Sequence, residues 1–99
     1  MLQELRVTIG VLQMDFLVPG ARSLKDKRRV VSSLKKLLHN RYNCSVAETE
    51  FKDRWGRARL TACVVGDDSR FVNTQLNEIA RFAGSKGEAE LIDYGIEML

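Results

Sequence analysis

Apolar and polar residues alternate along four stretches of the chain, and apolar residues recur with a helical period along two others. Alternation is typical of half-buried strands, whereas a spacing of three and four residues is typical of a helix that buries one face. Turn-forming residues separate the stretches, as at Pro19-Gly20. The pattern predicts strands over residues 5–18, 42–53, 57–66 and 88–99, and helices over residues 23–40 and from a cap at 67–69 to about 83.

This order of elements predicts an α+β fold of the ferredoxin-like, βαββαβ type. Right-handed connections give its four-stranded antiparallel sheet the order 4-1-3-2, with two helices on one face and the second and fourth strands at the edges. The chain has 99 residues, which is a common domain size, so we interpret residues 1–99 as a single domain.

In the first predicted strand, the apolar residues switch from one face of the strand to the other. They occupy odd positions from Leu5 and even positions from Leu12. A bulge or bend between Gly10 and Asp15 would explain the change. Before it, the outward-facing residues are predicted to be Arg6, Thr8 and Gly10.

The second and third strands are predicted to form a hairpin with a two-residue turn at Arg54-Trp55. That turn places Glu50 opposite Arg59 on the outer face. On the inner face it pairs Phe51 with Ala58, Thr49 with Leu60, Ala47 with Ala62, and Ser45 with Val64.

Charge is distributed unevenly along the chain. The net charge is only +3, but eight of the 16 basic residues and one of the 13 acids fall within residues 20–41. That segment therefore carries +7 and the remainder carries −4. Such a block suggests a surface that binds a polyanion.

The exposed side of the first predicted helix carries most of this positive charge, on Lys25, Arg28, Arg29, Lys35 and Lys36. Like charges four residues apart oppose helix formation, so this arrangement suggests a polyanionic partner such as RNA, and an ordinary solvated face is an equal alternative. The preceding residues Arg22 and Ser23 could add an anion site at the helix start, or Ser23 could be a plain cap.

Lys27 falls in the middle of the apolar stripe of the same helix. Its stem could pack against the core while its ammonium reaches solvent, which is the interpretation we favour. Alternatively, it could meet a buried acid such as Glu48.

The hairpin turn carries a second patch, made of Lys52, Arg54, Trp55 and Arg57. An exposed tryptophan among cations can stack on a nucleobase, but it can equally cap the core or contact a protein. The outward residues of the third strand are predicted to be Arg57, Arg59, Thr61, Cys63 and Val65. None is aromatic, so binding in the manner of RNA-recognition-motif domains, which stack bases on the sheet, is excluded.

Catalytic chemistry is poorly represented. The single histidine, His39, is predicted to complement a helix dipole, and no catalytic triad, phosphate-binding loop or metal-ligand spacing is present. We expect a non-enzymatic protein without cofactor or metal. A small phosphate-ester hydrolase using Arg22 is a third, less supported hypothesis.

Two cysteines, Cys44 and Cys63, are predicted to lie diagonally across the hairpin, about 7–8 Å apart, as free thiols. The sequence lacks a signal peptide or a transmembrane stretch, so we expect a cytoplasmic protein without membrane contact. Val46, Cys63 and Val65 would leave an apolar patch on the open sheet face. A homodimer through that face or an edge strand would cover it.

The run SLKDKR at Ser23–Arg28, following Pro19-Gly20, and the run NCSVAE at Asn43–Glu48 resemble the YlxP-like family of small bacterial proteins over essentially the whole chain. Thr49 stands where that family usually has an aliphatic residue. The resemblance implies a ferredoxin-like fold and no established activity. The family's genes often neighbour those of translation and ribosome maturation factors, which implies an RNA-binding or ribosome-associated module. The alternative is an interaction domain whose basic helix docks an acidic protein.

Overall fold

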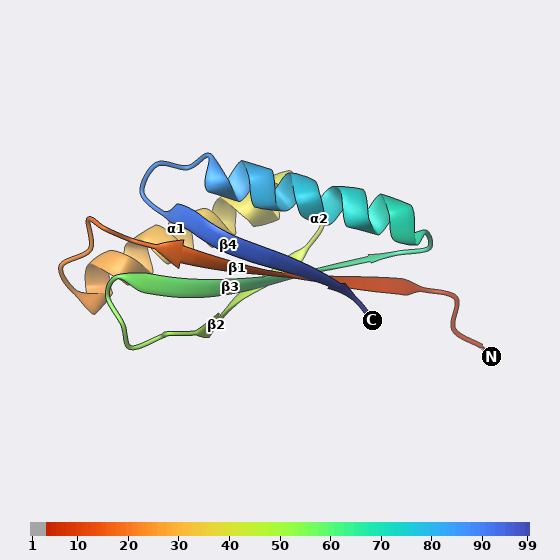
Figure 1. The fold of residues 1–99 in the computed structure, drawn as a ribbon, viewed down its shortest axis with the longest axis horizontal. Coiled ribbons are helices and arrows are strands. Elements are labelled where there is room, and N and C mark those ends of the chain that lie inside the picture. Colours follow the sequence, from red (N-terminus) through yellow and green to blue (C-terminus); the bar gives the residue numbers. More distant parts are fainter. Residues whose placement is uncertain (1–3) are drawn as a thin grey trace.

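The computed structural model describes residues 4–99 and contains the six predicted elements in the predicted order. The strands are β1 (Thr8–Leu17), β2 (Ser45–Glu50), β3 (Arg57–Gly66) and β4 (Glu90–Met98), and the helices are α1 (Leu24–Arg41) and α2 (Ser69–Gly84). The antiparallel sheet has the order β2-β3-β1-β4, which is the predicted series counted from the opposite edge. Both helices lie on one side of the sheet (Figure 1), so the protein is a two-layer α+β fold.

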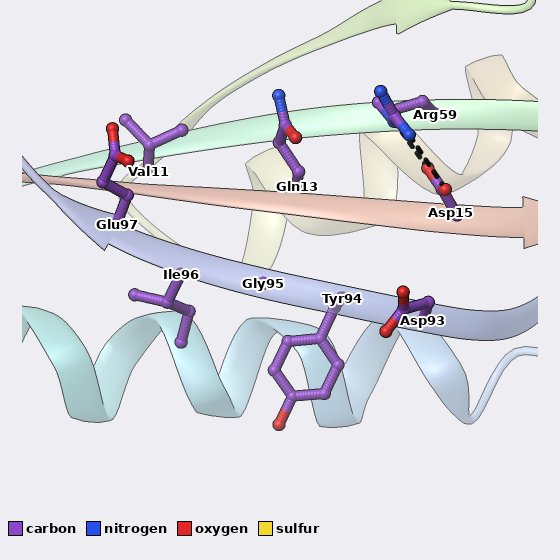
Figure 2. Close-up of a pocket in the computed structure, with 9 residues that line it drawn as sticks. All are labelled: Val11, Gln13, Asp15, Arg59, Asp93, Tyr94, Gly95, Ile96 and Glu97. Atoms are coloured by element: carbon purple, nitrogen blue, oxygen red, sulfur yellow. Dashed lines mark hydrogen bonds and ion pairs between the residues drawn. The ribbon is translucent and has the colours of Figure 1, made fainter.

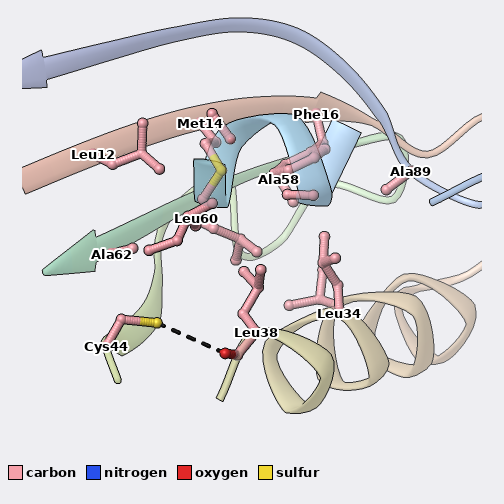
Figure 3. Close-up of a cluster of buried hydrophobic side chains, with 14 of the residues drawn as sticks. Leu12, Met14, Phe16, Leu34, Leu38, Cys44, Ala58, Leu60, Ala62 and Ala89 are labelled. Atoms are coloured by element: carbon pink, nitrogen blue, oxygen red, sulfur yellow. Dashed lines mark hydrogen bonds between the residues drawn. The ribbon is translucent and has the colours of Figure 1, made fainter. Parts of the chain in front are cut away.

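The core lies between the helices and one face of the sheet (Figure 3). Helix α2 buries one stripe, formed by Val72, Leu76, Ile79, Ala80 and Ala83. Helix α1 buries Val30, Val31, Leu34 and Leu38, whereas the apolar residue Leu37 is 40% exposed. Burying each large aliphatic side chain stabilises the fold by roughly 1.5–3 kcal/mol, so these two stripes hold the helices on the sheet.

The predicted bulge in the first strand is wrong. β1 pairs with β3 in unbroken register from Thr8 to Leu17. Gly10, predicted to face outward, is buried because α2 packs directly on it. A Cβ at this position would lie 2.6 Å from both Leu76 Cδ1 and Val72 Cγ1. Leu5 and Val7, which precede Thr8, are exposed, and the inward series simply begins at Gly10 and continues through Leu12.

The predicted inner face of the hairpin is displaced by one residue. Val46 pairs with Ala62 and Glu48 pairs with Leu60, so Val46 and Glu48 face the helices instead of the open side. Val46 therefore packs against the core and adds nothing to the predicted apolar patch. Glu48 faces inward because its partner on α1, described below, is buried there.

One predicted pair of the hairpin, Glu50 with Arg59, is present because β2 contains an extra residue. Thr49 is unmatched in the register, so Glu50 still pairs with Arg59, as predicted. The strands are joined by residues 51–56, a longer loop than the predicted two-residue turn. Because a bulge redirects the strand locally, the loop leaves the sheet at an angle that the alternation does not reveal.

The edges of the sheet are β2 and β4, as predicted. β4 also contains a register irregularity, opposite Asp15 and Phe16 of β1. Bulges and charges both discourage the pairing of an edge strand with another chain, and β4 carries Glu90, Asp93 and Glu97.

Candidate nucleic-acid interface

The start of α1 is fixed by two reciprocal hydrogen bonds. The backbone N–H of Asp26 donates to Ser23 Oγ at 3.0 Å, and the backbone N–H of Arg22 donates to Asp26 Oδ2 at 2.9 Å. Ser23 is therefore the N-cap that the sequence predicts. The Asp26 carboxylate already complements the helix dipole at this position, and the Arg22 side chain lies exposed beside it.

The predicted cations of α1 lie on its outer side. Lys25, Arg28, Arg29 and Lys36 are exposed, and Lys35 is half-buried. Within residues 4–99, Arg29 alone among these five forms an ion pair, at 3.4 Å to Glu88. We call these five residues the α1 basic face. Its other four charges are free to meet an external anion.

Lys27, by contrast, is wholly buried, so the expectation that its ammonium reaches solvent is wrong. The alternative partner is the observed one, since Lys27 Nζ lies 2.9 Å from Glu48 Oε2. The ammonium also donates to two backbone carbonyl oxygens, at 2.6 Å to Phe51 and 3.2 Å to Arg57. These acceptors offset the desolvation of a buried charge and tie the first turn of α1 to both ends of the hairpin loop.

The hairpin loop is held in a defined shape. Phe51 has a φ of 63°, a left-handed conformation that costs a bulky residue about 1–3 kcal/mol. Its carbonyl oxygen accepts from Lys27 Nζ and from the backbone N–H of Arg54 at 3.0 Å. The Gly56 carbonyl oxygen accepts from the backbone N–H of Val18 at 2.9 Å. The loop is thereby anchored at both ends, and Trp55 remains 55% exposed between the anchors.

The structure brings the two predicted patches to one end of the molecule. Figure 1 shows the start of α1 and the β2–β3 loop at the same end, away from the two chain termini. The Lys27 contacts connect them directly. We define the hairpin-tip patch as Lys52, Arg54, Trp55 and Arg57, and its loop lies at the same end of the molecule as the start of α1.

The open face of the sheet has different chemistry. Its β3 residues are those predicted, from Arg57 to Val65, but the β1 residues are Ile9, Val11, Gln13, Asp15 and Leu17. Neither central strand places an aromatic residue there, as predicted. The prediction of a homodimer stays a prediction.

An ion pair crosses this face between the central strands. Arg59 donates to Asp15 through Nε at 2.6 Å and through Nη2 at 3.1 Å, and Arg57 Nη2 lies 3.7 Å from Asp15. The hydrogen bond from Arg59 lowers the pKa of Asp15, outweighing the opposite effect of burial. The same bond raises the pKa of Arg59. The pair occupies the position at which an RNA-recognition motif would offer a stacking surface.

A shallow groove of about 430 Å³ runs beside this ion pair, between β1 and β4 (Figure 2). Gly95 forms its floor because it has no side chain, and the carboxylates of Asp93 and Glu97 flank it. Figure 2 shows Tyr94 and Ile96 turned toward α2 instead. The groove is more acidic than the α1 side, so it does not suit a phosphate.

Both cysteines are free thiols, as predicted, but they are not diagonal neighbours on one face. Cys63 pairs with Ser45 on the open face, whereas Cys44 is buried in the core and lies 3.9 Å from the Leu38 carbonyl oxygen (Figure 3). Burial raises the pKa of the Cys44 thiol, which opposes thiolate chemistry.

Two features of the described chain, residues 4–99, bear on other classes of function. The described residues contain no group of three or more histidine, cysteine or acidic side chains placed to hold a metal ion. Neither described helix combines the length and apolarity needed to cross a bilayer.

Two cation–aromatic clusters are not among the features predicted from the sequence. Phe51 lies under the guanidinium groups of Arg57 and Arg54, at 4.2 Å and 5.7 Å from its ring centroid. Phe82 lies under Arg41 at 4.6 Å and under Lys86 at 4.2 Å. In the first cluster the spacing of aromatic and basic residues was a usable signal, whereas the second depends on α1 and α2 being side by side.

These features define a small α+β domain with a basic helix and an aromatic residue at the tip of an anchored hairpin. The chain belongs to a family described as proteins of unknown function, DUF503, whose model matches residues 9–96. It is similar to the "Uncharacterized protein YlxP" of Bacillus subtilis (strain 168), at 27% identity over 82 residues, covering 83% of this chain and 89% of that protein. The predicted resemblance to the YlxP-like family is confirmed.

Proposed function

We propose that this protein is a non-enzymatic cytoplasmic module of ferredoxin-like fold that binds structured RNA, such as ribosomal RNA, through the α1 basic face. The observation that carries the proposal is the lack of acidic partners: four of the five cations of this face form no ion pair within residues 4–99. Unpaired like charges on one helix repel one another, and an external polyanion removes that repulsion.

The dimensions of the face suit a nucleic-acid backbone. From Lys25 to Lys36 the helix rises about 16 Å, at 1.5 Å per residue. Phosphates along one strand of duplex DNA advance about 3.4 Å per nucleotide, and A-form RNA advances by less, so the face spans at least roughly five nucleotides. Such contacts position the protein and carry no sequence information, so the RNA would be selected by shape.

The test is a salt titration of binding to a labelled ribosomal RNA hairpin. A variant with Lys25→Gln and Lys36→Gln should bind more weakly, and the slope of log affinity against log salt should fall by about two because two phosphate contacts are lost. The matched control is Arg70→Gln with Arg81→Gln, which removes the same charge from exposed positions of α2.

Equal loss in both variants would show that only the net charge matters and would overturn the assignment of the face. Binding to an acidic protein that survives nuclease treatment, with no affinity for purified RNA, would replace the proposal with the protein-docking alternative.

A further inference from the structure

We infer that Trp55 forms a stacking site for one unpaired nucleobase, next to the duplex that lies on the α1 basic face. This inference rests on the proposed function and adds the class of RNA: a helix interrupted or closed by unpaired nucleotides. Its basis is the structure of the hairpin loop, which is tied to the first turn of α1 and holds an exposed indole between its two anchored ends.

The hairpin loop is held by more hydrogen bonds to the rest of the protein than an ordinary turn requires. It buries the ammonium of Lys27, which donates to the carbonyl oxygens of Phe51 and Arg57 at the two ends of the loop. It also holds Phe51 at a positive φ and accepts a hydrogen bond from Val18 at Gly56. A binding group on a loop already ordered in this way loses little conformational entropy when a ligand arrives.

The indole itself is left without an internal role. Trp55 is 55% exposed, and within residues 4–99 it takes part in no aromatic pair and no cation–π contact. Phe51, four residues earlier, is covered by arginines and half-buried. Capping of the core, one of the roles open from the sequence, does not fit so exposed a side chain.

The charges around the indole favour a nucleic acid over an apolar protein surface. Lys52 and Arg54 are exposed and have no ion-pair partner among residues 4–99. Cations beside an aromatic ring are the combination with which proteins bind single strands, since the cations hold phosphates and the ring stacks on a base. A flat indole accepts any base, so the site is selective for unpaired nucleotides and not for sequence.

The position of the loop decides which RNA fits. Lys27 joins the two ends of the loop to the first turn of α1, so the loop that carries the indole lies at the end of α1 where the helix begins. An RNA duplex along α1 would therefore meet Trp55 where its base pairing ends, at a bulge or a terminal loop.

The single tryptophan in the chain makes the inference directly measurable. The experiment compares two RNAs, a stem with an unpaired loop and a fully paired duplex of the same stem sequence. Each is titrated while labelled-RNA anisotropy reports binding and intrinsic fluorescence reports stacking on Trp55. We expect quenching with the looped RNA and little quenching with the duplex.

Two variants separate stacking from folding. Trp55→Ala should weaken binding of the looped RNA by about 5- to 150-fold, which corresponds to the loss of one stacked base, and should leave duplex affinity unchanged. Trp55→Phe should retain most of the affinity because a phenyl ring can still stack.

The outcomes distinguish this inference from the proposed function. Binding of both RNAs without quenching, or equal weakening of both by Trp55→Ala, would overturn the stacking site and leave the α1 basic face standing. Absence of anisotropy change with either RNA would overturn the proposed function as well. Quenching by a protein partner, with none by RNA, would assign the indole to protein docking.

Discussion

Two lysines on the first turn of α1 have opposite environments. Lys25 is exposed and has no acidic partner within residues 4–99, whereas Lys27 is wholly buried with a carboxylate and two carbonyl oxygens around its ammonium. Two positions correspond to about 200° around a helix, so the two side chains leave on opposite sides. One basic segment therefore serves two purposes, because its inner charge stabilises the fold while its outer charges stay available to a ligand.

Lys27→Met is expected to produce the largest change. It leaves the Glu48 carboxylate and the Phe51 carbonyl oxygen without their cation in a poorly solvated place, and should lower the free energy of unfolding by about 3–5 kcal/mol. Denaturant unfolding measures this loss. The matched Lys25→Met variant should stay within about 0.5 kcal/mol of the parent chain. A loss at Lys25 as large as that at Lys27 would remove the distinction between the two lysines.

The different environments of Lys25 and Lys27 could be predicted only in part from the sequence. Helical periodicity correctly placed Lys27 on the buried side of α1 and the basic face on the exposed side. The partner of Lys27 depended on the hairpin register, which the predicted two-residue turn gave correctly at Glu50 but wrongly beyond it, because Thr49 is an extra residue in β2. A bulge shifts every side chain beyond it to the other face, and its position depends on tertiary contacts such as the buried ammonium.

A similar limit applied to the first strand. Apolar residues at Ile9 and Val11 suggested a change of face, yet they belong to the open side of an unbroken strand. The inner position was occupied by Gly10, which has no side chain to contribute to the pattern. A glycine required by close helix packing cannot be distinguished from a turn glycine by periodicity alone.

The ion pair between Asp15 and Arg59 on the open face is expected to contribute less to stability than Lys27 and more than Lys25. Asp15→Asn removes the negative charge and replaces one of the two oxygens that accept from Arg59 with an NH2 donor, so it should destabilise the protein at neutral pH, by less than Lys27→Met because Arg59 is part-exposed. The folded state lowers the pKa of Asp15, chiefly through Arg59, below its ordinary 3.8. The stabilisation is therefore complete above 3.8 and declines as the pH falls through the lower, folded-state pKa.

Urea unfolding at neutral and acidic pH measures this dependence. The difference between the parent chain and Asp15→Asn should narrow as the pH is lowered. Asp93→Asn on the neighbouring strand is the control, since Asp93 forms no ion pair among residues 4–99 and should show no such narrowing. If the difference in the free energy of unfolding between the two chains did not change with pH, the contribution of Asp15 to stability would come from its shape and not from its charge.

The smallest expected change in stability concerns Glu88, the acid that pairs with the α1 basic face. Both side chains are more than 60% exposed and the Arg29 Nη1 to Glu88 Oε2 distance is 3.4 Å, so Glu88→Gln should alter the free energy of unfolding by less than about 1 kcal/mol. RNA binding should nevertheless become tighter and more salt-dependent, because the substitution removes a negative charge and frees Arg29 for a phosphate. Glu78→Gln on α2 is the matched control, since it removes the same charge from an exposed acid that has no ion pair among residues 4–99. If both variants tightened binding equally, the gain would reflect net charge, and Arg29 would have no part in the interface.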